Sequence, residues 1–246
     1  MNDPGKASAP ARAATRLPKR FYKSVSIEKE GTGFALLLDG KPVHTPAKAK
    51  LLLPTRALAE AVAEEWRAQG DRIDPAAMPL TKLANSAIDG VAGRAEAVID
   101  DILAHAGADL LCYRAKGPRG LVEAQRKQWD PVLAWAKSTL GAPLVLVEGI
   151  VHVAQPRASL DRLRDALVGR EAFGLAALHV MTSLSGSAVL ALAVALGRMT
   201  PEEAWEAAHV DEDWQISQWG EDAEAKARRT ARRRDFAAAA RTLALL

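Results

Sequence analysis

Residues 172–197 read AFGLAALHVMTSLSGSAVLALAVALG, and this stretch decides which kind of fold the chain can have. It contains no Asp, Glu, Lys or Arg, so by its length alone it could cross a lipid bilayer. Its centre, however, is the polar run TSLSGS at 182–187, and a Ser/Gly cluster of this kind interrupts a helix. The sequence therefore predicts two short helices, 172–184 and 187–198, buried in the core of a soluble protein.

The composition is that of a soluble globular protein with one large domain or two small ones. The chain has 246 residues, of which 49% are hydrophobic and 26% charged. Its net charge of +3 comes from two segments, because residues 1–20 contribute +4 and residues 226–234 contribute +6. The rest of the chain then carries −7, which argues against a broad nucleic-acid-binding surface.

Two further features bear on the cellular compartment. The single cysteine, Cys112, cannot form an intrachain disulfide, and we expect it to be a small buried residue. Residues 1–18 are rich in Ala, Pro and basic residues and lack a continuous apolar segment. We predict a disordered basic tail there rather than a secretory signal, with a weak organellar presequence as the alternative.

The residues after the tail have the pattern of a β-meander. Strands are predicted at 21–30, 34–38, 41–45 and 51–53 from alternating apolar residues and from the turns between them. Asp39-Gly40 favours a type I′ hairpin, and Pro42 restricts the third strand to a sheet edge or to its own first residues.

From about residue 56 the apolar residues recur with the period of a helix. Gly90 and Gly93 interrupt this pattern and suggest a domain boundary near residue 90. The sequence predicts domains at 19–90 and 91–246, and a strong helix start at Thr200-Pro201-Glu202-Glu203, which has the pattern of a capping box. Residues 144–153 are predicted as a short pair of strands instead of a helix. The other predicted helices, besides the two of the apolar run, are 58–66, 81–89, 94–106, 120–129, 131–140 and 158–168.

Few residues have the pattern of a catalytic or metal site. Asp101, His105 and Asp109 recur every four residues and could ligate a metal if they shared a helix face, and residues 209–213 offer a similar weaker group. No phosphate-binding loop and no Gly-x-Ser-x-Gly motif is present in the sequence. We therefore expect that the protein is not an enzyme and has no cofactor. The alternative is a metal-dependent enzyme that uses Asp101, His105 and Asp109.

Residues 211–222, DEDWQISQWGED, form the most distinctive stretch of the chain and are predicted to be one helix. In such a helix Glu212, Gln215, Trp219 and Asp222 share a face with Ile216 beside them. Tryptophan is over-represented at the energetic centres of protein interfaces. The competing interpretation is that both tryptophans pack in the core and the acids are solvated.

The basic cluster 226–234 follows on a predicted C-terminal helix. We interpret it first as a solvated helix face. Nucleic-acid binding through this cluster, or binding of an acidic protein surface, is the alternative. Aromatic residues do not interleave with the basic ones, so stacking on bases has little support.

Several segments together resemble one family, the assembly chaperones for the alpha subunit of the F-type ATP synthase catalytic head, found in mitochondria and related bacteria. The resemblance covers about residues 20–225. The segments that carry it are Arg20–Lys23, Leu38–Pro42, Thr45-Pro46, Ala63–Trp66, Met78–Thr81, Ile88-Asp89, Asp109–Arg114, Gln128–Pro131, Asp211–Gln215 and Trp219–Asp222.

The resemblance implies a two-domain α+β protein with a β-containing N-terminal domain and a C-terminal orthogonal helical bundle. It implies a chaperone, monomeric when free, that binds the unassembled alpha subunit and hydrolyses no ATP. The expected compartment is the bacterial cytoplasm, or the mitochondrial matrix in a eukaryote. The family's acidic, glutamine-containing motif falls on Glu212, Gln215, Trp219 and Gly220, with Trp214 where relatives often carry Tyr. The expected partner-binding residues are Glu212, Gln215, Trp219, Asp222 and Asp211, with Glu212 as the first candidate.

Overall fold

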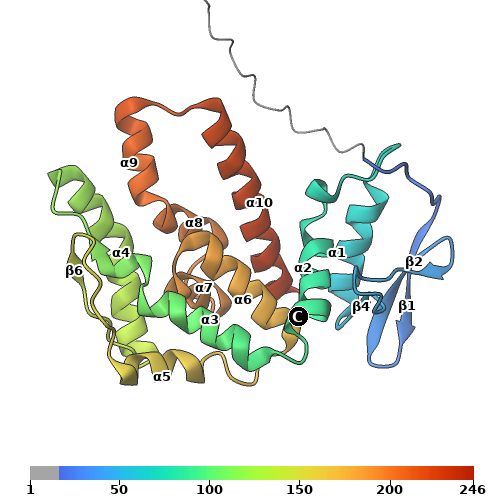
Figure 1. The fold of residues 1–246 in the computed structure, drawn as a ribbon, viewed down its shortest axis with the longest axis horizontal. Coiled ribbons are helices and arrows are strands. Elements are labelled where there is room, and N and C mark those ends of the chain that lie inside the picture. The colour runs from blue at the N-terminus through green and yellow to red at the C-terminus, as the bar shows by residue number, and fades with distance from the viewer. Residues whose placement is uncertain (1–16) are drawn as a thin grey trace, which may run out of the picture.

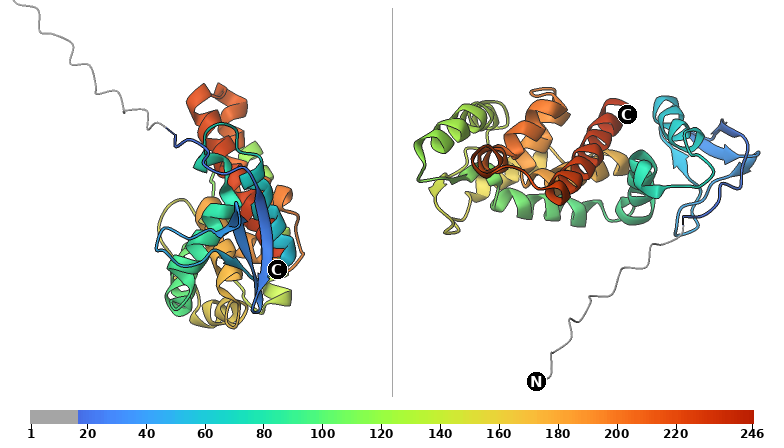
Figure 2. Two further views of the ribbon diagram at one scale, coloured as in Figure 1. Left: turned by 90° about the vertical axis from the view of Figure 1, so that its right-hand side faces the viewer. Right: turned by 90° about the horizontal axis from the view of Figure 1, so that it is seen from above.

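The computed structural model describes residues 17–246, so the tail predicted at 1–18 lies almost wholly outside the described residues. The molecule is elongated, with a small sheet and two helices at one end and the remaining helices at the other (Figures 1 and 2). This arrangement confirms the predicted α+β class. The division at residue 90 stays a prediction.

The first three strands of the N-terminal sheet form the predicted meander, but the fourth strand pairs with the second instead of continuing from the third. Strand β1 (Val25–Glu30) pairs antiparallel with β2 (Gly33–Leu38), which also pairs with β3 (Lys41–Pro42) and with β4 (Leu52–Leu53). Asp39 and Gly40 both have positive φ, 48° and 76°, as a type I′ turn requires. The Asp39 carboxylate also accepts hydrogen bonds from the backbone N–H groups of Lys23 and Ser24, which ties the turn to the preceding segment.

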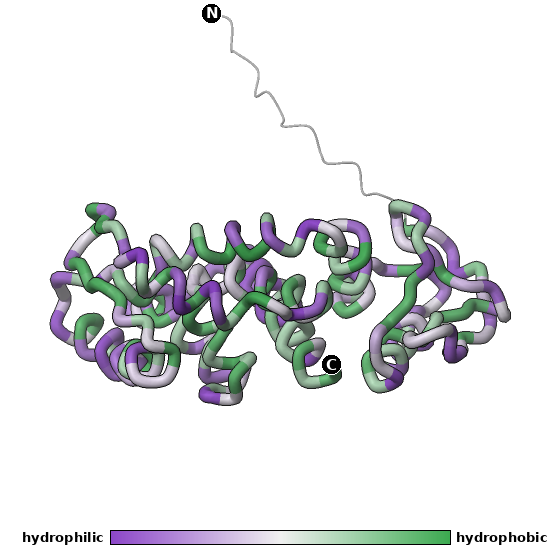
Figure 3. The backbone as a smooth tube through the Cα atoms, turned by 90° about the horizontal axis from the view of Figure 1, so that it is seen from below, coloured by the Kyte–Doolittle hydropathy of each residue, from purple (hydrophilic) through white to green (hydrophobic). Residues whose placement is uncertain are grey.

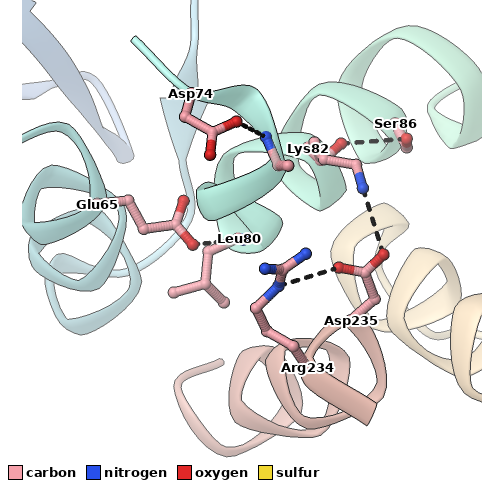
Figure 4. Close-up of polar contacts among 8 residues, drawn as sticks. Glu65, Asp74, Leu80, Lys82, Ser86, Arg234 and Asp235 are labelled. Atoms are coloured by element: carbon pink, nitrogen blue, oxygen red, sulfur yellow. Dashed lines mark hydrogen bonds and ion pairs between the residues drawn. The ribbon is translucent and has the colours of Figure 1, made fainter. Parts of the chain in front are cut away.

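Two helices pack beside this sheet. Helix α1 (Arg56–Arg67) is capped by Thr55, and a short 3₁₀ turn, η1 (Pro75–Ala77), leads to α2 (Pro79–Ser86), which continues as a π-helical turn, η2 (Ala87–Val91). The N-terminus of α2 has no cap of its own. Glu65 of α1 supplies one, because its carboxylate accepts hydrogen bonds from the backbone N–H groups of Leu80 at 2.7 Å and Thr81 at 2.8 Å (Figure 4 shows the bond to Leu80). Helix α2 is thereby held against α1.

The C-terminal part is almost entirely helical, and hydrophobic and hydrophilic residues alternate along most of its helices (Figure 3). A two-residue parallel pair, β5 with β6, lies on its outer flank beside α4 (Figure 1). The elements in chain order are α3 (Ala95–Gly107), η3 (Leu110–Cys112), β5 (Tyr113–Arg114), α4 (Arg119–Thr139), β6 (Val147–Glu148), α5 (Arg157–Asp165), α6 (Ala172–Ser185), α7 (Ala188–Ala195), α8 (Pro201–Ala208), α9 (Val210–Trp219) and α10 (Ala223–Ala244).

The apolar run 172–197 forms two core helices, as predicted. Helix α6 ends at Gly186, whose φ of 72° is a left-handed cap, and Ser187 begins α7 by accepting a hydrogen bond from the Leu190 N–H. Most residues of both helices are buried. Across residues 17–246 no helix has the length and hydropathy to cross a membrane.

Two predictions for residues 120–153 were wrong. Helices predicted at 120–129 and 131–140 are one helix, α4, which continues through Pro131. Proline removes one helical hydrogen bond, but α4 is held in place beside it by Trp129, which is fully buried and donates its indole N–H to the Ala207 carbonyl at 2.7 Å. Residues 144–153 contain a single strand, β6, which pairs with β5 and forms no hairpin of its own.

Helix α10 joins the two ends of the molecule. Near its middle Asp235 pairs with Lys82 of α2 at 3.3 Å, and further on Arg241 pairs with Glu64 of α1 at 3.4 Å (Figure 4 shows the first of these pairs). At its C-terminal end the Leu245 carbonyl accepts a hydrogen bond from the Thr55 hydroxyl. The same helix packs along α6 and α8, so it contacts both the sheet-bearing part and the helical part.

Candidate functional site

The distinctive stretch 211–222 is divided between two helices rather than forming one. Helix α9 follows α8 directly at His209 and ends at Trp219. Gly220 has φ 83° and ψ 174°, a conformation that other residues rarely adopt, and it turns the chain toward α10. Asp222 accepts hydrogen bonds from the N–H groups of Glu224 and Ala225 and so caps α10. The predicted four-residue stripe therefore stops at Trp219.

One face of α9 is held against α4 by an aromatic contact. The Trp214 ring lies on Gly120, in the first turn of α4. A Cβ atom at Gly120 would lie 2.8 Å from Trp214 Cζ3 and closer still to Cη2, so any other residue would collide with the ring. Trp214 is half-buried in this contact.

A hydrogen bond from a buried amide fixes the start of α9. The side-chain NH₂ of Gln125 donates to Asp211 Oδ1 at 2.7 Å, and the Gln125 carbonyl oxygen accepts from the backbone N–H of Ala115 at 2.9 Å. Because Gln125 is buried, both bonds satisfy polar groups that water cannot reach. Asp211 therefore has a structural role in addition to the binding role predicted for it.

The other two acids of α9 face α10. Arg229 of α10 forms an ion pair with Asp213, and its Nε lies 4.0 Å from Glu212 Oε2. The same Glu212 oxygen lies 3.8 Å from His209 Nε2. At these separations the Glu212 carboxylate is weakly held, and its side chain is 40% exposed.

His209 is a buried, neutral neighbour of this acid. Its ring stacks on Trp205 with centroids 3.8 Å apart, and its Nδ1–H donates to the Trp205 carbonyl at 2.7 Å. Burial lowers the pKa of His209 below its ordinary value, and the nearby Arg229 and Arg232 act in the same direction against the pull of Glu212. The imidazole is therefore predominantly neutral at neutral pH and does not neutralise the carboxylate of Glu212.

The outer face of α9 is presented to solvent. Trp219 is 79% exposed, and Gln215, one turn earlier, is exposed as well. Of the five residues predicted to bind a partner, these two and Glu212 lie near one another on α9, whereas Asp211 and Asp222 are occupied by the contacts described above. The binding role of all five stays a prediction.

The basic cluster 226–234 is largely matched by groups of the chain itself. Arg229 pairs with the acids of α9, and the Arg232 guanidinium donates to the Leu184 carbonyl at 2.7 Å. Lys226 lies 3.6 Å from Glu221, and Arg228 pairs with Glu224. The ion pairs between α9 and α10 were not predicted from the sequence. The acidic residues 211–213 and the basic residues 226–234, on either side of the turn after α9, could have indicated them.

The alternative metal site is not formed. Helix α3 ends at Gly107, so Asp109 leaves the face of Asp101 and His105. Asp109 is buried and accepts hydrogen bonds from Leu111 and Val189 N–H groups, and burial raises its pKa to about 6. Asp101 pairs instead with His179 at 2.6 Å. Within the described residues no three His, Cys, Asp or Glu side chains are grouped to hold a metal, and the 209–213 group is no exception.

Cys112 is buried, as predicted, and burial raises the pKa of its thiol to about 12. At neutral pH the thiol is therefore fully protonated and is no nucleophile.

Known proteins resemble this chain over nearly its whole length. Residues 19–137 match the family model described as ATP12 chaperone protein. The crystal structure of Atp12 from Paracoccus denitrificans is 44% identical, with a TM-score of 0.86 over 93% of this chain and 98% of that one. An Agrobacterium tumefaciens protein, solved as a chaperone candidate, is 51% identical with a TM-score of 0.89 over 93% and 86% of the two chains. The mitochondrial atp12 protein of Schizosaccharomyces pombe is 24% identical over 85% of this chain and 77% of its own length.

Proposed function

Because the chain belongs to the ATP12 family of ATP synthase assembly chaperones, we propose that its client is the unassembled alpha subunit of the F-type ATP synthase catalytic head. The chaperone covers the alpha surface that later contacts the beta subunit, and so prevents aggregation or wrong pairing. It acts as a monomer where the head assembles, in the bacterial cytoplasm or the mitochondrial matrix.

The observation that carries this proposal is the exposed indole of Trp219 on a helix that is fixed on two sides. A side chain of this size, 79% exposed, is an anchor of the kind that partners bury at interface centres. Helix α9 is held in the free chain by the hydrogen bond of Asp211 to α4 and by the ion pair of Asp213 with α10. The client therefore meets a preformed surface and little ordering of the chaperone is needed on binding.

The acidic residues around the Trp219 indole are suited to a chaperone that must later release its client. An unassembled subunit exposes an apolar, partly charged surface, and carboxylates at the rim of an interface steer the encounter more than they add to affinity. Glu212 is the acid of α9 with the weakest internal contacts, so it is the one most available to a basic group of the client.

Mixing the purified chain with freshly refolded alpha subunit tests the proposal. We expect a complex on size-exclusion chromatography and less light scattering from alpha than in its absence. The beta subunit serves as the control and should give neither effect. Failure of the wild-type chain to form a complex with alpha, under conditions where alpha is still monomeric, would rule the proposal out.

Replacing Gly120 with alanine should weaken client binding several-fold while barely changing stability. The new methyl group displaces the Trp214 ring and with it the outer face of α9. The helix itself loses nothing, because alanine is the better helix former by up to about 1 kcal/mol. Near-UV circular dichroism reports the ring movement and titration with alpha reports the affinity.

The matched control is Gly107→Ala, since a Cβ atom there meets nothing within 4 Å. A changed aromatic spectrum together with unchanged affinity in Gly120→Ala would show that the position of Trp214 does not matter for binding.

A further inference from the structure

The segment around β6 holds more exposed large hydrophobic residues than any other short stretch of the described chain. Ten large hydrophobic residues of the described part are exposed, and four of them fall within 145–151. Ile150 is 96% exposed and Val151 71%, and Val145 and Leu146 are also exposed. An apolar cluster of this kind on a surface marks an interaction site.

The backbone of the same segment has one free edge. The Gly149 N–H donates to the Arg114 carbonyl at 2.9 Å, which places the alternate residues Val147 and Gly149 toward β5. On that side the side-chain amide of Gln155 continues the ladder with two hydrogen bonds to the Val145 backbone, at 2.8 and 3.0 Å. The N–H and C=O groups of Leu146 and Glu148 point the other way, where residues 17–246 provide no strand.

The charges around β6 are unbalanced. A cavity of about 280 Å³ separates β6 from α4 and is lined by Arg126 and Glu148 among others. Lys116 lies over Gly149 at the end of the strand. Neither Arg126 nor Lys116 has an ion-pair partner in the described part of the chain, and the one acid of the strand, Glu148, is likewise unpaired. Two cations against one carboxylate complement a ligand that carries an acidic group.

We propose that the outer edge of β6 docks an extended apolar segment of the client that carries an acidic side chain. The segment adds as a strand, so that its backbone pairs with Leu146 and Glu148 and its apolar side chains cover Ile150 and Val151. Its carboxylate lies between Lys116 and Arg126. That this client is the alpha subunit rests on the function proposed above.

This docking edge is linked to α9 through one residue. Gln125 lines the cavity under β6 and donates its hydrogen bond to Asp211 at the start of α9. The two surfaces therefore flank the same helix, α4, and one client can reach both.

The test uses the full chain with Ile150→Asp and Val151→Asp combined, and purified alpha subunit as the probe. We expect the affinity for alpha to fall at least tenfold. Val168→Asp is the matched control, because Val168 is an exposed valine outside this segment, after α5, and its replacement should change nothing. Amide hydrogen exchange of the wild-type chain should slow at Leu146 and Glu148 when alpha is added.

The outcomes separate the two proposals. Wild-type affinity retained by the double variant, or exchange at Leu146 and Glu148 that alpha does not slow, would overturn the docking site and leave the alpha-subunit client intact. Absence of any binding by the wild-type chain would overturn both.

Discussion

Replacing Glu212 with lysine is expected to abolish co-purification with the alpha subunit while the melting temperature stays within a few degrees of the wild type. The carboxylate lies 3.8 Å from His209 and 4.0 Å from Arg229 and is 40% exposed, so little of the fold depends on it. Exposed pairs of this kind contribute about 0–1 kcal/mol to folding. A lysine there, in contrast, adds a cation beside Arg229 and repels the basic group that we expect the client to bring.

Two controls make this result specific to the site. Glu202→Lys reverses a charge on an exposed face of α8, one helix earlier, and should bind alpha normally. Glu212→Gln keeps the shape and removes only the charge, so it should bind with intermediate affinity. If Glu212→Lys unfolds instead, the residue is structural and the idea of a binding acid loses its support.

Replacing Trp129 with alanine is expected to produce the largest loss of stability of any single change in the helical part. The ring is fully buried, its N–H bonds to the Ala207 carbonyl at 2.7 Å, and the Arg114 guanidinium lies over it at 5.2 Å. Removing a buried aromatic of this size costs about 3–5 kcal/mol, which is a large part of the total stability of a typical domain. At about 2–4 °C per kcal/mol for a chain of this size, the melting temperature should fall by about 10 °C.

The control for this change is Trp135→Ala, two turns along the same helix, where the ring is only half-buried and the loss should be much smaller. Thermal unfolding followed by far-UV circular dichroism measures both. Equal effects at the two positions would contradict the claim that Trp129 holds α4 in place beside Pro131. Client binding should fail in Trp129→Ala only at temperatures where the helical part unfolds.

Local signals in the sequence predicted most of the fold. The Asp39-Gly40 turn, the capping box at Thr200 and the break at Gly186-Ser187 depend on neighbouring residues alone, and all three were predicted correctly. The effect of Pro131 was predicted wrongly, because it depends on a residue distant in the sequence. Its local tendency to end a helix is overcome by packing of Trp129 against α8, a partner almost 80 residues away.

The candidate site was harder to predict, because contacts between residues far apart in the sequence fix the positions of its side chains. Helical spacing placed Glu212, Gln215 and Trp219 near one another, and the structure keeps them on one helix. Spacing could not show that Gly220 ends this helix, nor that Asp211 bonds to Gln125, 86 residues earlier. It also gave no sign of the outer edge of β6, since that edge exists only because residues 113–114 and 147–148 meet in space.

Helix α10 has a consequence for any partner that touches both ends of the molecule. It is tied to α9 through Arg229 and to α1 through Arg241, and these two residues are separated by about 18 Å of straight helix at 1.5 Å per residue. The helix therefore sets the spacing between α9 and α1. A client that contacted both helices would have to span that distance.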